Sequence, residues 1–176
     1  MFSMMSSAQT YDKLWKEVEK AQANGLPQTA IKYAEEIYRK AEAEKNSGQM
    51  LKAYTARTGF RQAINPDSFY VDLKGLEKWA TTTTIHEDCA VLHTLIAKAY
   101  SDFASRNQYS PQWRTDVVDT PSEDMREWST NLFVQKVLDH THAALDDLVL
   151  LLSLSTTAYI PFVNQQVYST YYNHNL

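Results

Sequence analysis

The side chains best suited to chemistry gather between His86 and His93. His86, Cys89 and His93 are spaced at i, i+3 and i+7, so on a helix they would share one face, and all three are zinc-ligand types. The zincin pattern H-E-x-x-H is not met, because Ala90 occupies the place of the second histidine. Cys89 and His93 also fall on the apolar side of their segment. We therefore interpret them as a small thiol and a polar ring at the edge of a core, and predict no metal site. A helical metalloenzyme built on these three residues is the alternative.

The remaining candidate groups give no catalytic constellation. His140 and His142 are two residues apart, so their rings would diverge by roughly 200° on a helix and could not chelate one ion. His174 has no partner nearby in the sequence. Adjacent acidic residues point roughly 100° apart on a helix and are interpreted as solvated charge; these pairs are Glu35-Glu36, Glu123-Asp124 and Asp146-Asp147. The phosphate-binding motif G-x-x-x-x-G-K-[ST] and the motifs G-x-S-x-G and G-x-G-x-x-G are absent from the sequence. We predict no catalytic, cofactor-binding or metal-binding residue, no cofactor and no enzymatic activity.

Aromatic side chains offer a second kind of candidate surface. The chain has eleven Tyr and four Trp, and several of them could line a sugar or peptide groove: Trp15, Tyr38, Trp79, Tyr100 and Trp128. They recur at helical spacing, which is more typical of a core.

Two amphipathic helices within Tyr11–Lys45 organise the elements that must position these groups. Their apolar residues recur at helical spacing on each side of a corner, Asn24–Pro27. Thr10 is the expected N-cap of the first helix, Asn24-Gly25 its left-handed stop, and Pro27 suits the first turn of the second. Glu35 and Glu36 precede Arg39 and Lys40 by four residues, the favourable order for ion pairs.

Further helices follow along the rest of the chain. The pattern predicts a break at Lys45–Gly48 and then a helix that carries Met50, Leu51, Tyr54, Ala56 and Phe60 and ends at Asn65-Pro66-Asp67. A helix capped by Asp67 or Ser68, a loop at Thr81–Thr84 and a helix over Ile85–Asn107 follow. After an irregular connection over Tyr109–Pro121 we expect a helix capped by Ser129 and a short helix from Asp146-Asp147 to Leu154. Helix pairs begin about 37 residues apart, close to the 34 of tetratricopeptide repeats. We predict an all-α fold, an antiparallel helix-hairpin array resembling a tetratricopeptide superhelix.

Composition restricts the class of protein. The chain has 176 residues, 44% hydrophobic, with a net charge of −4 and no run of Lys or Arg, so a nucleic-acid partner is not expected. A single cysteine excludes an intrachain disulfide, and no apolar run reaches the roughly 20 residues that span a bilayer. We expect residues 1–8 to be the remnant of a signal peptide, with Ser6-Ser7-Ala8 as its cleavage site. A helical repeat-like domain over 9–154 would follow, and then an irregular tail, 155–176, that leads to a missing downstream region.

Several segments, in their order along the chain, resemble the start of bacterial alpha-2-macroglobulin-like proteins. They are Tyr11–Trp15, Leu26–Ala30, Ile37–Ala41, Leu92-His93, Ala99-Tyr100, Arg106-Asn107, Trp113–Thr115, Asp124-Met125, Trp128-Ser129 and Tyr171–Leu176. The resemblance covers nearly the whole chain from Tyr11. It implies the helical N-terminal part of a very large secreted protein, export to the periplasm or cell surface, and a genuine signal peptide.

Function in that family resides in a C-x-E-Q thioester and a bait region that a protease cuts. Cys89 is followed by Ala90-Val91-Leu92, so no thioester residue is carried over. The expected function is a non-catalytic helical scaffold or interaction domain at the N-terminus of a large exported macroglobulin-like protein implicated in protease trapping. Its partners would be the downstream macroglobulin domains of the same chain, or a peptide or protein ligand. The alternative is a stand-alone tetratricopeptide-like adaptor that binds a peptide or glycan.

Overall fold

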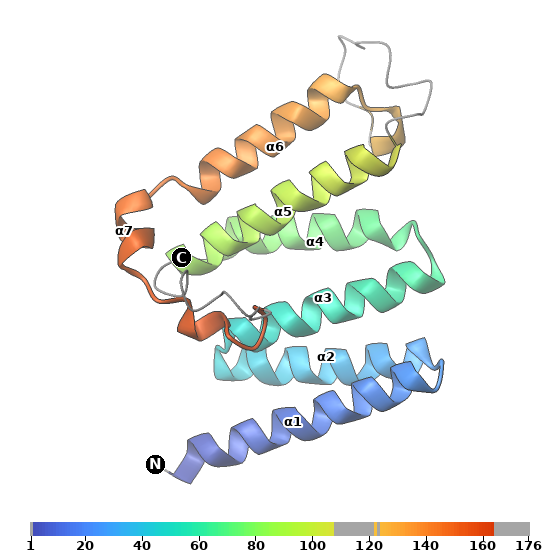
Figure 1. Ribbon diagram of the computed structural model, residues 1–176, viewed down its shortest axis with the longest axis vertical. Helices are drawn as coiled ribbons and strands as arrows, with labels where there is room; N and C mark the ends of the chain where they lie inside the picture. Colours follow the sequence, from blue (N-terminus) through green and yellow to red (C-terminus); the bar gives the residue numbers. More distant parts are fainter. Residues whose placement is uncertain (1, 108–121, 123, 164–176) are drawn as a thin grey trace, which may run out of the picture. The chain divides into compact units, whose positions relative to one another are not determined.

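The computed structural model describes residues 2–107, 122 and 124–163, and within these residues the regular secondary structure is helical, with no strand (Figure 1). The α-helices are α1 (Phe2–Ala23), α2 (Pro27–Glu44), α3 (Ser47–Ile64), α4 (Ser68–Thr82), α5 (His86–Asn107), α6 (Thr130–Ala144) and α7 (Leu148–Ser153), with 3₁₀ turns η2 (Met125–Glu127) and η3 (Thr156–Tyr159). The prediction of an all-α fold is confirmed. The tetratricopeptide-like superhelix stays a prediction.

Two compact units divide the chain, and the division falls inside α4. The first unit contains the residues up to Asp72 together with the described residues from Ser155 on, and the second contains Leu73–Leu154. The described part of the expected tail thus groups with the first three helices.

The corner between α1 and α2 is built as its residues predict. Gly25 has φ +66°, the left-handed conformation that glycine adopts without a Cβ clash, and Pro27 stands at the start of α2. The Leu26 N–H donates to the carbonyl of Ala21 at 2.9 Å and closes the end of α1. The expected N-cap at Thr10 is wrong, because α1 already begins at Phe2. Residues 2–9 contain neither Gly nor Pro, and extending an existing helix costs far less than starting one.

A second tight corner joins α2 to α3. Lys45 adopts the left-handed conformation with φ 53°, and its N–H reaches back to the last carbonyls of α2. Asn46 then caps α3, its side-chain oxygen accepting from the Gln49 N–H at 3.1 Å. Both corners are short, so α1, α2 and α3 lie as successive antiparallel neighbours (Figure 1).

One apolar core fills the space between these three helices. Four of its seven buried members are alanines, which let the helices approach closely. The buried members are Tyr11, Val18, Ala21, Ala30, Ile37, Ala41 and Ala53. Trp15 and Tyr38 pack against this core, so the sequence interpretation of these two aromatics as core residues is confirmed. The polar atoms of the core aromatic side chains are hydrogen-bonded: Trp15 Nε1 donates to Gln49 at 2.8 Å and the Tyr11 hydroxyl donates to Glu44 at 2.7 Å.

The segment η3 packs on α3 through a glycine. Tyr159 is buried, and Gly48 on α3 lies so close to the Ala158 carbonyl that a Cβ on Gly48 would stand 2.3 Å from that oxygen. Only glycine fits this contact without displacement.

In the second unit α5 and α6 pack against each other as an antiparallel pair (Figure 1). Ser129 caps α6 and Asp147 caps α7, each accepting from the backbone N–H three residues on, as the sequence predicts. Leu92, Ile96 and Phe133 are fully buried between the helices.

The predicted loop at Thr81–Thr84 is wrong in its first half. Thr81 and Thr82 belong to the last turn of α4, and their hydroxyls donate to the Lys78 carbonyl, each at 2.9 Å. The predicted connection over 109–121 lies outside the described residues. None of the helices that the structure describes is both long enough and apolar enough to cross a bilayer.

Candidate functional site

The structure brings together two histidines that lie 47 residues apart in the sequence. The Nδ1 atom of His93 on α5 lies 2.8 Å from the Nδ1 atom of His140 on α6, a hydrogen bond in which one ring must donate and the other accept. The ring centroids are 5.0 Å apart. Neither the i, i+3, i+7 pattern around His93 nor the His140-Thr141-His142 pattern predicted this pairing.

A carboxylate and a phenol complete what we call the histidine cluster: Glu77, His93, Tyr100 and His140. His140 Nε2 lies 4.0 Å from the Glu77 Oε1 atom, to which the Tyr100 hydroxyl donates at 2.5 Å. The Tyr100 ring also stacks on His140, with centroids 5.7 Å apart. The Glu77 carboxylate favours an N–H on the His140 Nε2 atom. His140 Nδ1 then accepts, and His93 donates from its own Nδ1.

Burial sets the charge state of this cluster. It lowers the pKa of both His93 and His140, and the facing His93 ring lowers the pKa of His140 further. Glu77 and Asp139 oppose that effect and Lys136 adds to it. Burial and the hydrogen bond to Glu77 raise the pKa of Tyr100. Both rings are thus held neutral near pH 7.

Aromatic rings enclose the cluster on one side. Tyr100 stacks on Trp128 with centroids 5.8 Å apart, and Phe133 lies against both rings. The Trp128 Nε1 atom donates to the Ser122 carbonyl at 2.6 Å. Tyr100 and Trp128 therefore pack inside the second unit, as the core interpretation of the aromatics predicts, and His140 keeps only 15% of its side chain exposed.

The three residues of the metal hypothesis are separated in the fold. His86 is exposed at the start of α5, while Cys89 points to the Ala80 carbonyl, 3.9 Å from its Sγ. Burial raises the pKa of the Cys89 thiol, which disfavours the thiolate. No three His, Cys, Asp or Glu side chains within the described ranges are arranged to hold a metal ion. His142 is exposed and His174 lies outside the described residues.

A buried ion pair in the first unit is structural in character. Asp72 is 4% exposed, its Oδ1 atom lies 2.9 Å from Arg61 Nη1, and its carbonyl accepts from the Tyr54 hydroxyl at 2.6 Å. Arg57 stacks over the rings of Tyr38 and Tyr54. Burial raises the pKa of Asp72, while Arg61 and Arg57 lower it. These contacts join α3 to the first turns of α4.

The second unit also carries an exposed apolar surface. Of the twelve large hydrophobic side chains exposed among the described residues, six fall within 134–152, each between 45% and 83% exposed. We call these six the α6–α7 apolar surface: Val134, Leu138, Leu145, Leu148, Val149 and Leu152. Val134, Leu138 and Leu145 recur at i, i+4 and i+11, which places them on one side of α6, away from the buried Phe133.

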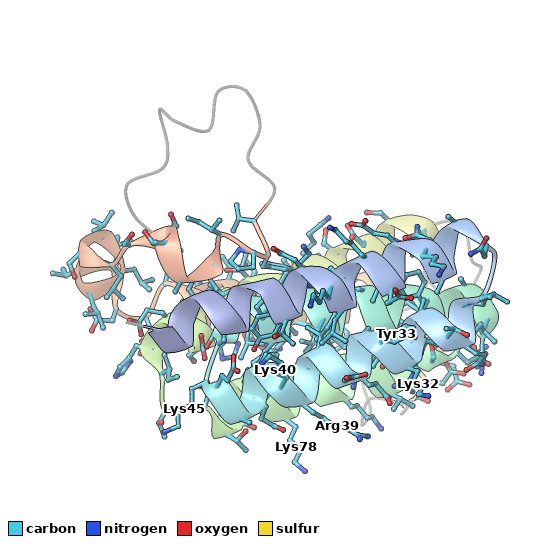
Figure 2. The ribbon with its side chains drawn as sticks, turned by 90° about the horizontal axis from the view of Figure 1, so that it is seen from below. Lys32, Tyr33, Arg39, Lys40, Lys45 and Lys78 are labelled. Atoms are coloured by element: carbon cyan, nitrogen blue, oxygen red, sulfur yellow. The ribbon has the colours of Figure 1, made fainter. Side chains whose placement is uncertain are left out.

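Charged side chains elsewhere are mostly balanced. Lys32 and Arg39 lie along α2 and Lys45 directly follows it (Figure 2), but acidic residues alternate with them. Glu35 pairs with Arg39 at 4.0 Å as predicted, whereas Lys40 pairs forward with Glu44. These are exposed i, i+4 pairs and contribute little to stability.

Comparison with family models, with curated proteins and with solved structures finds no match to this chain. The geometry of the described residues therefore carries the functional argument, together with the sequence resemblance.

Proposed function

We propose that this chain is a non-catalytic helical interaction domain that binds a protein partner through the α6–α7 apolar surface. The observation that carries the proposal is the concentration of six exposed large hydrophobic side chains in one segment. Val149, the second residue of α7, is 83% exposed. Exposed large hydrophobic side chains that gather in one part of a chain are typical of protein-binding surfaces.

Charge indicates the chemistry of the partner. Between residues 134 and 152 the chain has three acidic residues, Asp139, Asp146 and Asp147, and one basic residue, Lys136. A partner segment with apolar side chains flanked by Lys or Arg would bury the hydrophobic residues and meet the carboxylates. An amphipathic basic helix satisfies both requirements, and helix recognition by an apolar groove or face is a common mode.

The remaining polar groups support a role without catalysis. The groups of the histidine cluster bond to one another and are packed among aromatic rings. Asp72 is engaged by Arg61 inside the first unit. In both places the polar side chains hold helices together.

The test uses two designed helical peptides with the same leucine stripe, one with lysines and one with glutamates on the polar face. Fluorescence anisotropy with the full chain should give at least tenfold tighter binding of the lysine peptide. The double variant Val149→Ser, Leu152→Ser should weaken that binding at least tenfold, because each side chain contributes about 1.5–3 kcal/mol when buried. Leu26→Ser, at a position in the first unit that is about as exposed as Leu152, is the control and should change nothing.

Equal affinity for the two peptides, or an unaffected double variant, would overturn the proposal. Sedimentation of the chain alone adds a second check. A dimer that the double variant dissociates would make a second copy the occupant of this surface, in place of a basic partner.

A second proposal places the domain at the N-terminus of an exported alpha-2-macroglobulin-like protein. The segments that resemble this family follow one another in the expected order along the sequence from Tyr11 to Leu176, which supports the proposal. The helical fold agrees with what the resemblance implies. Sequencing the gene beyond Leu176 tests it. An open frame with β-rich domains and a C-x-E-Q motif is expected, and a stop codon directly after Leu176 would leave an independent adaptor. Export would be tested by fractionation of cells that express the natural gene.

A further inference from the structure

We propose that His93 and His140 form an acid-sensitive clasp: their hydrogen bond holds α5 against α6 at neutral pH and is lost when acid protonates both rings. The proposal is independent of the partner and of the α6–α7 apolar surface. Its basis is the direct Nδ1–Nδ1 hydrogen bond of 2.8 Å between the two helices.

The hydrogen bond between the two rings can form with only one proton between the two Nδ1 atoms. An imidazole pair that faces through Nδ1 holds together with one proton between the two nitrogens, whether the pair is neutral or carries one positive charge. When both rings are protonated, two N–H groups point at each other across 2.8 Å and the bond is lost. Two positive rings would then also repel each other at a centroid distance of 5.0 Å.

Neighbouring charged side chains can offset only part of the repulsion between two protonated rings. Glu77 on α4 and Asp139 on α6 favour a charged His140, while Lys136 on α6 disfavours it. Glu77 lies 4.0 Å from His140 Nε2, and its Oε1 atom already accepts from Tyr100 on α5. His93, for which burial alone lowers the pKa, has no such carboxylate among the causes of its shift.

The sign of the linkage follows from these directions. The pKa values of both histidines are lower in the folded chain than in the unfolded chain, where they lie near 6.5. Above about pH 6.5 both rings are neutral in either state and the clasp is fully present. As the pH falls below that value, the unfolded chain takes up protons that the folded chain resists. The folding equilibrium constant then falls by up to tenfold per pH unit for each histidine, until the folded pKa values are reached.

The experiment measures urea unfolding of the full chain between pH 7.5 and 5.5, together with hydrogen exchange of the α5 and α6 amides. The variant His140→Asn places a neutral amide near the position of Nδ1, so it can still accept from His93 but cannot titrate. The wild type should lose stability over this range, with faster exchange in α6. In His140→Asn the folding equilibrium constant should fall by about tenfold less per pH unit than in the wild type, over the range where both wild-type histidines titrate. His142→Asn, exposed and two residues away on the same helix, is the matched control and should follow the wild type.

An identical pH dependence in the wild type and His140→Asn would overturn the clasp. Nitrogen-15 spectra of the wild-type imidazoles provide a measurement that needs no variant. We expect the pKa values of His93 and His140 to lie below 6.5, because burial disfavours both charged rings. Ordinary titration of His93 and His140 near pH 6.5 would overturn the proposal, even if His140→Asn failed to fold.

Discussion

The contact between Gly48 and η3 gives the sharpest prediction, because one methyl group decides it. In Gly48→Ala the new Cβ would stand 2.3 Å from the Ala158 carbonyl oxygen and 3.1 Å from the Pro161 ring. Real Cβ atoms essentially never approach another atom closer than 3.0 Å, so something must move by about 0.7 Å. The nearest atom is a backbone oxygen, which cannot swing aside as the end of a long side chain would.

The magnitude follows from two opposing effects. Alanine is favoured over glycine by up to about 1 kcal/mol inside a helix, and by less in the first turn where Gly48 stands. Overpacking a tight contact costs about 1–3 kcal/mol. We expect Gly48→Ala to lower the free energy of unfolding of the first unit by about 1–2 kcal/mol. Release of η3 would expose Tyr159, which is only 2% exposed in the wild type.

Gly59 is the matched control on the same helix. A Cβ at Gly59 would meet nothing within 4 Å, so Gly59→Ala gains helix propensity without a clash. We expect it to raise the stability by about 0.5–1 kcal/mol. Urea unfolding followed by far-UV circular dichroism measures both variants, and limited chymotrypsin digestion reports cleavage after Tyr159. Equal stabilisation by the two substitutions, with Tyr159 still protected in Gly48→Ala, would refute the packing of η3 on α3.

Two further predictions concern the buried contacts of Asp72. Tyr54→Phe removes the hydroxyl that donates to the Asp72 carbonyl at 2.6 Å, and should lower the free energy of unfolding by about 1–2 kcal/mol in urea titrations. Arg61→Gln removes the partner of a carboxylate that is 4% exposed, and should cost about 2–3 kcal/mol at pH 7, less than a fully enclosed pair because Arg61 is itself one-third exposed. Because burial raises the Asp72 pKa in the folded chain, this carboxyl favours folding at low pH and loses that contribution as the pH rises through its folded pKa. The cost of Arg61→Gln should therefore shrink when unfolding is measured at pH 4.5, and a cost that does not change with pH would contradict the buried pair.

Local signals in the sequence predicted most helix boundaries. Gly25 and Pro27 act through their own backbone geometry, and Ser129 and Asp147 through a hydrogen bond three residues on, so a short window contains the whole cause. The errors are local too. Thr10 has the side chain of a cap but follows residues that extend the helix, and Thr81-Thr82 bond back into the turn that they were expected to end.

The candidate sites depended on contacts that no window contains. His93 appeared in a false metal pattern with His86 and Cys89, and His140 in a pair with His142, because spacing along one helix was the available signal. The exposed apolar stripe of α6 was equally hidden. Leu132, Phe133, Val137 and Leu138 are all apolar, so the sequence does not distinguish them. Only tertiary packing decides that Phe133 is buried while Leu138 stays exposed.

The sequence by itself determined the all-helical fold, the corner between α1 and α2, and the residues at which α6 and α7 begin. Propensity, hydrogen bonding and backbone sterics act there over three or four residues. The tertiary structure alone decided that His93 meets His140, that Gly48 receives the Ala158 carbonyl, and which side of α6 remains uncovered. Each of these depends on two helix faces meeting in one register. That register is fixed by the summed packing of many side chains rather than by any one of them.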